Sequence, residues 1–237
     1  MPAPVLHSEV ARALGEEIVG GVVPAGHVLT LAGLEERFSR SRTVLREAVR
    51  VLESLGLVVS KRRVGVVVQP PEAWSVLSPQ VIAWRLGSGA REEQLRSLTQ
   101  LRRAIEPNAA RAAAARRGGD AAGPLLEAAE RLQALGERGE GATEAYIEAD
   151  VAFHAQLLRA SGNEMFAALE PSISEVLRGR ARLGRNPAWP TPRSLDHHRE
   201  LARAVAEGRA EEAEAMARAI AGDVLREVAG HEGSPED

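Results

Sequence analysis

The side chains best suited to chemistry in this sequence are one acid and two histidines in its C-terminal half. Asp150 and His154 lie four residues apart in a helical stretch, which places both on one helix face. His198 opens a further predicted helix, HRELARAVAEG. A carboxylate and two imidazoles that converge from different helices suit a divalent metal ion such as Zn²⁺. The alternative is that Asp150 only accepts a hydrogen bond from His154, with His198 exposed.

The composition narrows the classes of protein to which these residues can belong. The 237 residues include no cysteine, which excludes disulfide bonds, thiolate metal sites and a cysteine nucleophile. The first residues lack the basic and apolar regions of a signal peptide, and no uncharged apolar run is long enough to span a bilayer. We therefore expect a cytoplasmic protein with no membrane partner. Aromatic residues make up only 3%, which favours close-packed helices.

Positive charge is concentrated in one part of the chain. The net charge is −3, yet residues 37–63 carry eight basic groups and two acidic ones. A locally basic segment on an acidic chain is typical of a nucleic-acid-binding head. Charge alone would fit a solvated helix face equally well, so the pattern of the segment has to decide between the two.

Residues 1–69 have the pattern of a winged helix-turn-helix domain. Residues 7–21 have a helical apolar period, Thr30 is placed to cap a short second helix, and Ser39 or Ser41 is placed to cap a third that ends before Gly56. The segments LVVS and GVVVQ, joined by KRRVG, predict a β-hairpin. Three helices followed by a basic hairpin wing is the plan of a winged helix.

The third helix is suited to reading DNA. Its sequence, SRTVLREAVR, begins with small polar and basic groups and keeps its other face apolar, as a recognition helix requires. Arg42 and Arg46 share one face and suit guanine or phosphate, whereas Arg50 lies a turn further and suits the DNA backbone. The glycine in the basic hairpin tip, residues 61–65, allows close approach to a groove. An arginine-rich helix with a purely structural role is the alternative.

The rest of the chain reads as a linker followed by helices. The stretch QPPEAWSVLSP at residues 69–79 is proline-rich and has no sustained period, so we expect a linker and a first connecting helix over residues 70–90. An all-α antiparallel bundle of six or seven helices follows over residues 91–229, with a tail over 230–237. The fold class is thus mainly α. Glycines or prolines interrupt the helical pattern at 118–119, 139–141, 161–162 and 187–192.

The N-terminal pattern resembles the GntR family of bacterial regulators over residues 5–68. SRTVLREAVRVLESLGL followed by KRRVGVVV is similar to the family's SRTPVREALRRLEAEGLV and G-R-G-T-F-V wing, and the P-x-G turn at residues 24–26 agrees. The resemblance implies a regulator that binds double-stranded DNA. Together with the pattern above, it gives these candidate DNA contacts: Ser41, Arg42, Thr43, Arg46, Arg50, Arg62, Arg63 and Gly65.

The sequence departs from that family pattern at three places, one of which is the segment before the second helix, which is one residue shorter. Ala32 and Gly33 stand where many relatives carry a basic residue, so one DNA contact of the family is in doubt. The wing has Arg63 and Val64 where the family prefers Gly-Arg.

Residues 91–226 resemble the helical effector domain of the FadR branch of this family, the FCD type. The matching segments are LRRAIEPNAA at 101–110, DVAFH at 150–154, SGN at 161–163 and HRELARAVAEG at 198–208. Many such domains hold a metal through one Asp and three His, with the effector's carboxylate completing the shell. Asp150, His154 and His198 match three of these ligands, but Ala219 stands at the fourth, three residues after Met216. Three protein ligands still hold zinc with open positions.

The resemblance also makes Arg102 the candidate that binds the carboxylate of an effector, because a guanidinium does so in bidentate geometry. An ion pair with Glu106 at i+4 is an equally simple interpretation, and the two uses do not exclude each other. Trp189 is either a lid or surface packing. The candidate effector-binding residues are Arg102, Asp150, His154, Asn163, Ser194 and His198.

Residues 74–84, WSVLSPQVIAW, are similar to a stretch in repressors of galactonate utilisation, a subgroup that also lacks the fourth histidine. The implied effector is a small carboxylate such as a sugar acid. We expect a homodimeric repressor, not an enzyme, that reads a pseudo-palindromic operator.

Two other functions stay open. One is a metal-dependent hydrolase with an accessory head, although no glutamate lies in sequence beside the three ligands as an obvious base, and the winged helix would go unexplained. The other is a DNA-binding protein whose C-terminal domain only dimerises.

Overall fold

A computed structural model of the chain describes residues 3–116 and 122–231. The predicted break at 118–119 and residues 232–237 of the predicted tail lie outside these ranges. The protein is mainly α-helical with one small sheet, as predicted, and divides into two compact units, Met1–Gln94 and Leu95–Asp237. None of the described helices is both long enough and apolar enough to cross a membrane.

The first unit opens with a winged helix. Its elements are α1 (Ala3–Val19), β1 (Val28–Leu29), α2 (Leu31–Phe38), α3 (Arg42–Ser54), β2 (Val58–Lys61) and β3 (Gly65–Val68). The side chain of Thr30 accepts a hydrogen bond from the Gly33 N–H and so caps α2. Ser41, not Ser39, caps α3, because Ser39 has the left-handed backbone that ends α2.

The apolar stripe of α3 forms the centre of this unit. Leu45, Ala48 and Leu52 are fully buried in one cluster with Leu14 of α1 and Val66 of β3. Burying a leucine side chain of this kind contributes about 1.5–3 kcal/mol relative to leaving it exposed. The stripe therefore fixes which side of α3 faces inward and leaves the polar side free.

The sheet has three antiparallel strands in the order β1-β3-β2. The hairpin β2-β3 is the predicted wing, whereas β1 was not expected because two residues carry no periodic signal. Gly65 begins β3 beside the end of β1: it has φ +128°, and a Cβ there would lie 2.7 Å from the Leu29 carbonyl oxygen. The glycine thus serves the packing of the sheet.

The segment predicted as a linker and first connecting helix belongs to the same unit. It contains the short 3₁₀ helix η1 (Pro71–Ala73) and α4 (Pro79–Leu86). Helix α4 packs against α1, where the ring of Trp84 lies so close to Gly15 that a Cβ on that glycine would be 2.4 Å from it. The indole N–H of Trp74 donates to the Gln69 carbonyl, 3.0 Å away.

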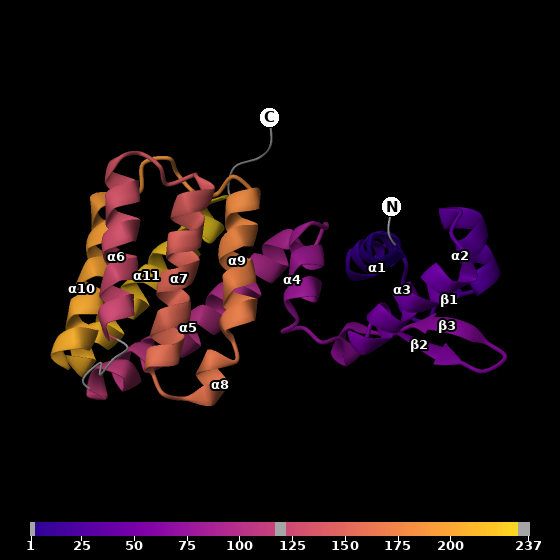
Figure 1. Ribbon diagram of the computed structural model, residues 1–237, viewed down its shortest axis with the longest axis horizontal. Coiled ribbons are helices and arrows are strands. Elements are labelled where there is room, and N and C mark those ends of the chain that lie inside the picture. The colour runs from indigo at the N-terminus through magenta and orange to yellow at the C-terminus, as the bar shows by residue number, and fades with distance from the viewer. Residues whose placement is uncertain (1–2, 117–121, 232–237) are drawn as a thin grey trace. The chain divides into compact units, whose positions relative to one another are not determined.

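The second unit is a bundle of helices (Figure 1). In the described residues it contains seven helices: α5 (Arg91–Ala115), α6 (Ala122–Glu137), α7 (Glu144–Ala160), α8 (Glu164–Ala167), α9 (Glu170–Arg182), α10 (Pro192–Glu207) and α11 (Ala210–His231). Helices α6, α7, α9 and α10 run alongside one another, and α11 packs on α10. Buried alanines of α5, α10 and α11 let these helices approach closely around Phe153 and Leu157 of α7.

Candidate effector site and DNA-binding surface

The polar side of α3 presents an exposed basic surface. Ser41, Arg42, Thr43, Arg46 and Arg50 are all exposed on it. Arg42 forms an ion pair with Glu35 at 3.0 Å and Arg50 one with Glu47 at 2.7 Å. Exposed pairs of this kind contribute about 0–1 kcal/mol, so they leave the guanidinium groups available to DNA.

The wing is fastened to this helix. The Ser60 N–H of β2 donates to Oε1 of Glu53 on α3, with a distance of 2.6 Å. Arg62 and Arg63 are exposed at the wing tip, and Arg63 has a left-handed backbone with φ 65°. Arg63 stands where the family prefers glycine, which adopts this conformation easily. Other residues adopt it at a cost of about 1–2 kcal/mol.

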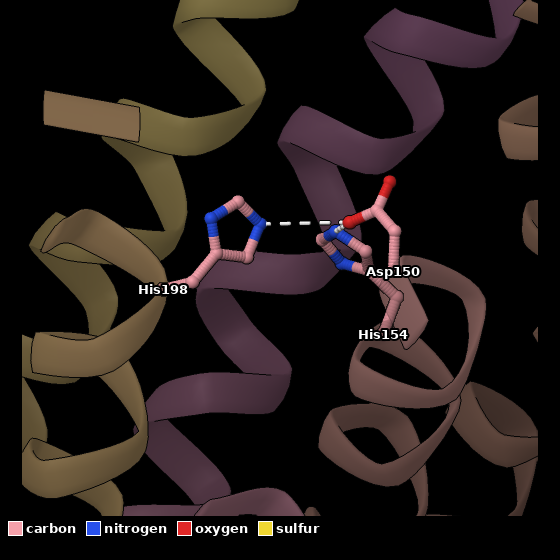
Figure 2. A group of neighbouring side chains, drawn as sticks. All are labelled: Asp150, His154 and His198. Carbon is pink, nitrogen blue, oxygen red and sulfur yellow. Dashed lines mark ion pairs between the residues drawn. The ribbon is translucent and has the colours of Figure 1, made fainter. Parts of the chain in front are cut away.

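In the second unit, the acid and the two histidines converge as predicted. Figure 2 shows Asp150 and His154 of α7 facing His198, which comes from α10. One potential ligand atom from each lies within 4.8 Å of the others. The ring of Phe153 packs edge-on against both imidazoles, with centroids 5.4 and 5.0 Å away. His198 is buried in α10, which begins six residues earlier than predicted, so the exposed helix-start alternative is wrong.

The tautomer of His198 suits metal binding. Its Nδ1 lies 2.8 Å from the Ser194 carbonyl oxygen, which only accepts hydrogen bonds, so Nδ1 carries the proton and Nε2 carries the lone pair. That Nε2 is buried, has no hydrogen-bond partner in the described part of the chain, and lies 3.6 Å from Oδ1 of Asp150. The carboxylate, this orphaned nitrogen and His154 together fit a divalent cation.

The charges around Asp150 keep it ionised. Burial alone would raise the pKa of Asp150, but the nearby imidazoles of His154 and His198 hold that pKa well below its ordinary value. Burial lowers the pKa of His154, yet the charge of Glu106 raises it, and the net shift is upward. The site therefore combines an anionic oxygen with imidazole nitrogens in a buried place.

A buried ion pair stands beside this cluster. Nε of Arg102 donates to Oε1 of Glu106 at 2.7 Å, and both side chains are about 1% exposed. Nη2 of Arg102 lies 2.9 Å from Nε2 of His154, whereas its Nη1 is buried without a hydrogen-bond partner among the described residues. The predicted ion pair is thus present, and the arginine still has donors to spare.

These side chains border a cavity of about 90 Å³ inside the bundle. It is lined by Arg102, Tyr146, Asp150, His154, Arg180, Asn186, Pro187, Pro190, Thr191, Ser194, His198, Ile220 and Asp223. Two guanidinium groups, two imidazoles and several hydroxyl or amide groups are a lining that suits a small polar anion.

Comparison with known proteins agrees with both halves of this description. Residues 97–222 match the FCD domain, and residues 6–68 match the bacterial regulatory proteins of the gntR family. The chain belongs to the FCD branch of the GntR family. This GntR protein is therefore a DNA-binding transcription regulator, and its bundle is an effector-binding domain.

Two curated relatives extend over most of the regulator. The galactonate operon transcriptional repressor of Escherichia coli K12 is 29% identical over 192 residues, which are 79% of this chain and 81% of that protein. The HTH-type transcriptional regulator LutR of Bacillus subtilis is 28% identical over 205 residues, 83% of this chain and 88% of that protein.

Solved structures share the fold at low identity. Lar, described as controlling the expression of the Listeria monocytogenes agr system, has a TM-score of 0.62 at 18% identity and covers 94% of this chain and 96% of its own. Escherichia coli McbR/YncC has a TM-score of 0.55 at 16% identity and covers 96% and 99%.

Some predicted site residues of the GntR regulator lie elsewhere. Asn163 caps α8 by accepting from the Met165 N–H, 2.9 Å away, and is not part of the cavity lining. Trp189 is 68% exposed and its ring packs over Gly139, outside the cavity. Ser194 does line the cavity, and its carbonyl orients His198.

The position predicted for a fourth metal ligand also points away. Ala219 lies on a different face of α11, with Glu211 and Ala215, whereas Ile220 and Asp223 border the cavity. Sequence reasoning missed Asp223 and, on α9, Arg180, which is buried although it is an arginine in the last turn of an amphipathic helix. The signal available in the sequence was the position of Arg180, which follows Ile173, Val176 and Leu177 at helical spacing and so lies on the apolar face of α9.

Proposed function

We propose that this regulator is a repressor that releases its operator when a small hydroxy acid or sugar acid binds in the cavity of the helical domain. The observation that carries the proposal is Arg102. It is buried, it borders the cavity, and its Nη1 has no partner in the described residues. A buried donor without a partner costs about 1–3 kcal/mol, which a bound carboxylate would recover.

The three potential metal ligands also favour an acid as the effector. Asp150, His154 and His198 would hold a divalent cation such as Zn²⁺, which with three protein ligands supplies open positions for a carboxylate or hydroxyl oxygen. Arg102 lies next to His154, so its guanidinium would orient the same acid from the other side. Arg180 adds a second cation to the lining.

The size of the cavity bears on the class of acid. One water molecule needs about 10–15 Å³ of cavity volume. The cavity of about 90 Å³ therefore has room for several waters, or for one compact acid in their place. Asn186, Thr191 and Ser194 supply polar groups for hydroxyls. A short hydroxy acid such as lactate fits these dimensions directly, whereas a six-carbon aldonic acid, as the name of the Escherichia coli relative suggests, would need the lining to move.

For the operator, we assign base or phosphate contacts to the exposed residues of the recognition helix and the wing. Arg42 and Arg46 read bases, Ser41, Thr43 and Arg50 contact the DNA backbone, and Arg62 and Arg63 enter the neighbouring groove. A homodimer places two such heads on a pseudo-palindrome. Its site of action is then the cytoplasm, where operator DNA lies.

Fluorescence anisotropy with DNA from upstream of the regulator's own gene tests the proposal. Binding is measured at two salt concentrations, with and without lactate, galactonate, gluconate and citrate. Tight, salt-sensitive binding that one acid weakens at least tenfold supports a repressor with that inducer. Tight binding unchanged by every acid, together with no thermal shift, would contradict induction by a small hydroxy acid or sugar acid of this class.

Two variants make the result specific. Arg102→Lys keeps the positive charge but loses the bidentate geometry, so it should bind the operator normally and respond weakly to the acid. Arg218→Lys is the matched control, because Arg218 forms the same i, i+4 pair with a glutamate on the exposed surface of α11. Equal acid responses in both variants would contradict a role for Arg102.

A further inference from the structure

Glu106 holds an unusual place, because it is a fully buried carboxylate that does not line the cavity. Its Oε1 accepts from Nε of Arg102 at 2.7 Å and also lies 3.3 Å from Nδ1 of His154. One oxygen of α5 thus contacts both the arginine proposed to bind the effector and a histidine proposed to bind metal.

The contacts around His154 select one tautomer. A carboxylate only accepts hydrogen bonds, so the Nδ1 that faces Glu106 must carry a proton. Nη2 of Arg102 only donates, and it lies closer to Nε2, at 2.9 Å, than to Nδ1, at 3.3 Å, so Nε2 is the nitrogen that carries the lone pair. In the opposite tautomer, the lone pair of Nδ1 would face the Glu106 oxygen. The N–H on Nε2 would then face the N–H groups of Arg102 Nη2.

We propose that Glu106 is a positioning residue, which holds His154 in the tautomer whose Nε2 lone pair faces Asp150 and His198. The proposal rests on the metal site put forward above as part of the regulator's function. A carboxylate behind a ligating histidine fixes its ring and tautomer, and removing such a group typically weakens metal binding 10–100-fold.

A matched pair of double variants isolates this role. Arg102→Met/Glu106→Met removes both charges and leaves Nδ1 of His154 without an acceptor. Arg102→Met/Glu106→Gln also removes both charges but keeps an amide oxygen at the place of Oε1. The two proteins differ at one side chain only. We expect the methionine pair to shift His154 to the Nε2–H tautomer, which donates to Asp150, and the glutamine pair to keep the Nδ1–H tautomer.

The tautomer is read in metal-free protein from the ¹⁵N chemical shifts of labelled histidine, with the His154 signal assigned by its loss in His154→Ala. Zn²⁺ affinity, measured by competition with a chromophoric chelator, should be 10–100-fold weaker in the methionine pair than in the glutamine pair. An Nε2–H tautomer in the wild type, or the same tautomer in both double variants, would overturn the proposal.

Two further outcomes distinguish a failure of the proposed metal site, or of folding, from a failure of the proposed role of Glu106. If the methionine pair does not fold by circular dichroism, the wild-type tautomer alone decides the question. If the wild type binds no Zn²⁺ or Mn²⁺ but shows the Nδ1–H tautomer that the methionine pair loses, the metal site of the proposed function fails while the role of Glu106 in positioning His154 stands.

Discussion

Replacing only Arg102 should destabilise the bundle far more than replacing Arg102 and Glu106 together. Burial alone would raise the pKa of Glu106, but Arg102 and His154 lower it to about 2 from an ordinary value of 4.5. That difference corresponds to about 3 kcal/mol in favour of the charged form. Removing one partner of a buried pair typically costs about 3–5 kcal/mol, whereas replacing both partners with apolar residues is close to neutral.

The same pair gives a pH dependence of defined sign. In the wild type, the folded pKa of Glu106 lies below the unfolded one, so its contribution to stability is present above about pH 4.5 and is lost as pH falls toward 2. In Arg102→Met, burial raises the pKa of Glu106 above its ordinary value. The deficit of this variant should therefore be largest at pH 8 and shrink as pH falls to 5.

Urea unfolding of the full chain, followed by circular dichroism, measures these effects in Arg102→Met, Glu106→Met and the double variant. Hydrogen exchange in α5 and α7 assigns the affected transition to the second unit. We expect the double variant to be at least about 2 kcal/mol more stable than the sum of the single losses predicts. Additivity within about 0.5 kcal/mol would refute a tightly coupled buried pair.

Three further predictions concern DNA and effector binding. Arg42→Ala should cost about 1–3 kcal/mol on the cognate operator and relax base preference, measured by anisotropy on single-base operator variants; an equal loss on all DNA would assign it to phosphate. Arg63→Gly and Arg63→Ala should lose the same DNA contact, but the glycine variant should be about 1 kcal/mol more stable to urea, because φ is 65° there; equal stabilities would refute the strain. Gly141→Ala should weaken acid binding in calorimetry without affecting operator binding, because its Cβ would lie 2.3 Å from the Pro187 carbonyl oxygen of the cavity lining. Gly123→Ala, with open space around it, is the control, and a normal acid affinity in Gly141→Ala would contradict the prediction.

The DNA-binding half could be predicted closely because its signals are local. Ser41 caps α3 by accepting from the N–H of Val44, three residues later. The apolar stripe that ends at Leu52 determines which face of the helix points into the core. Strand β1 escaped prediction because its two residues pair only with β3, far along the chain. The sequence predicted a first connecting helix within residues 70–90, where α4 lies, but the packing of Trp84 on Gly15 was not visible in it.

The effector half was predictable only in part. Asp150 and His154 converge through helical spacing, but whether His198 meets them depends on how α10 packs on its neighbours, which spacing does not determine. Arg180 and Asp223 reach the cavity through the same packing. On α11, Ala219 and Ile220 are neighbours in sequence but lie about 100° apart around the helix axis. An alignment to the family that is wrong by one residue therefore moves the predicted ligand position from the face that borders the cavity to another face. The capping role of Asn163, before Glu164, was a local signal that the resemblance to the family obscured.

The bond between Glu53 and Ser60 has a consequence for regulation. It ties the wing to the recognition helix, and the shared core ties both to α1, so the reading surface of each head has one shape. In the proposed homodimer of such heads, we expect an effector to leave the affinity of each head for its half-site unchanged. We expect it to change instead the effective concentration of the second head at its half-site once the first head is bound. Induction then acts on avidity, and an isolated half-site should bind equally well with and without the acid.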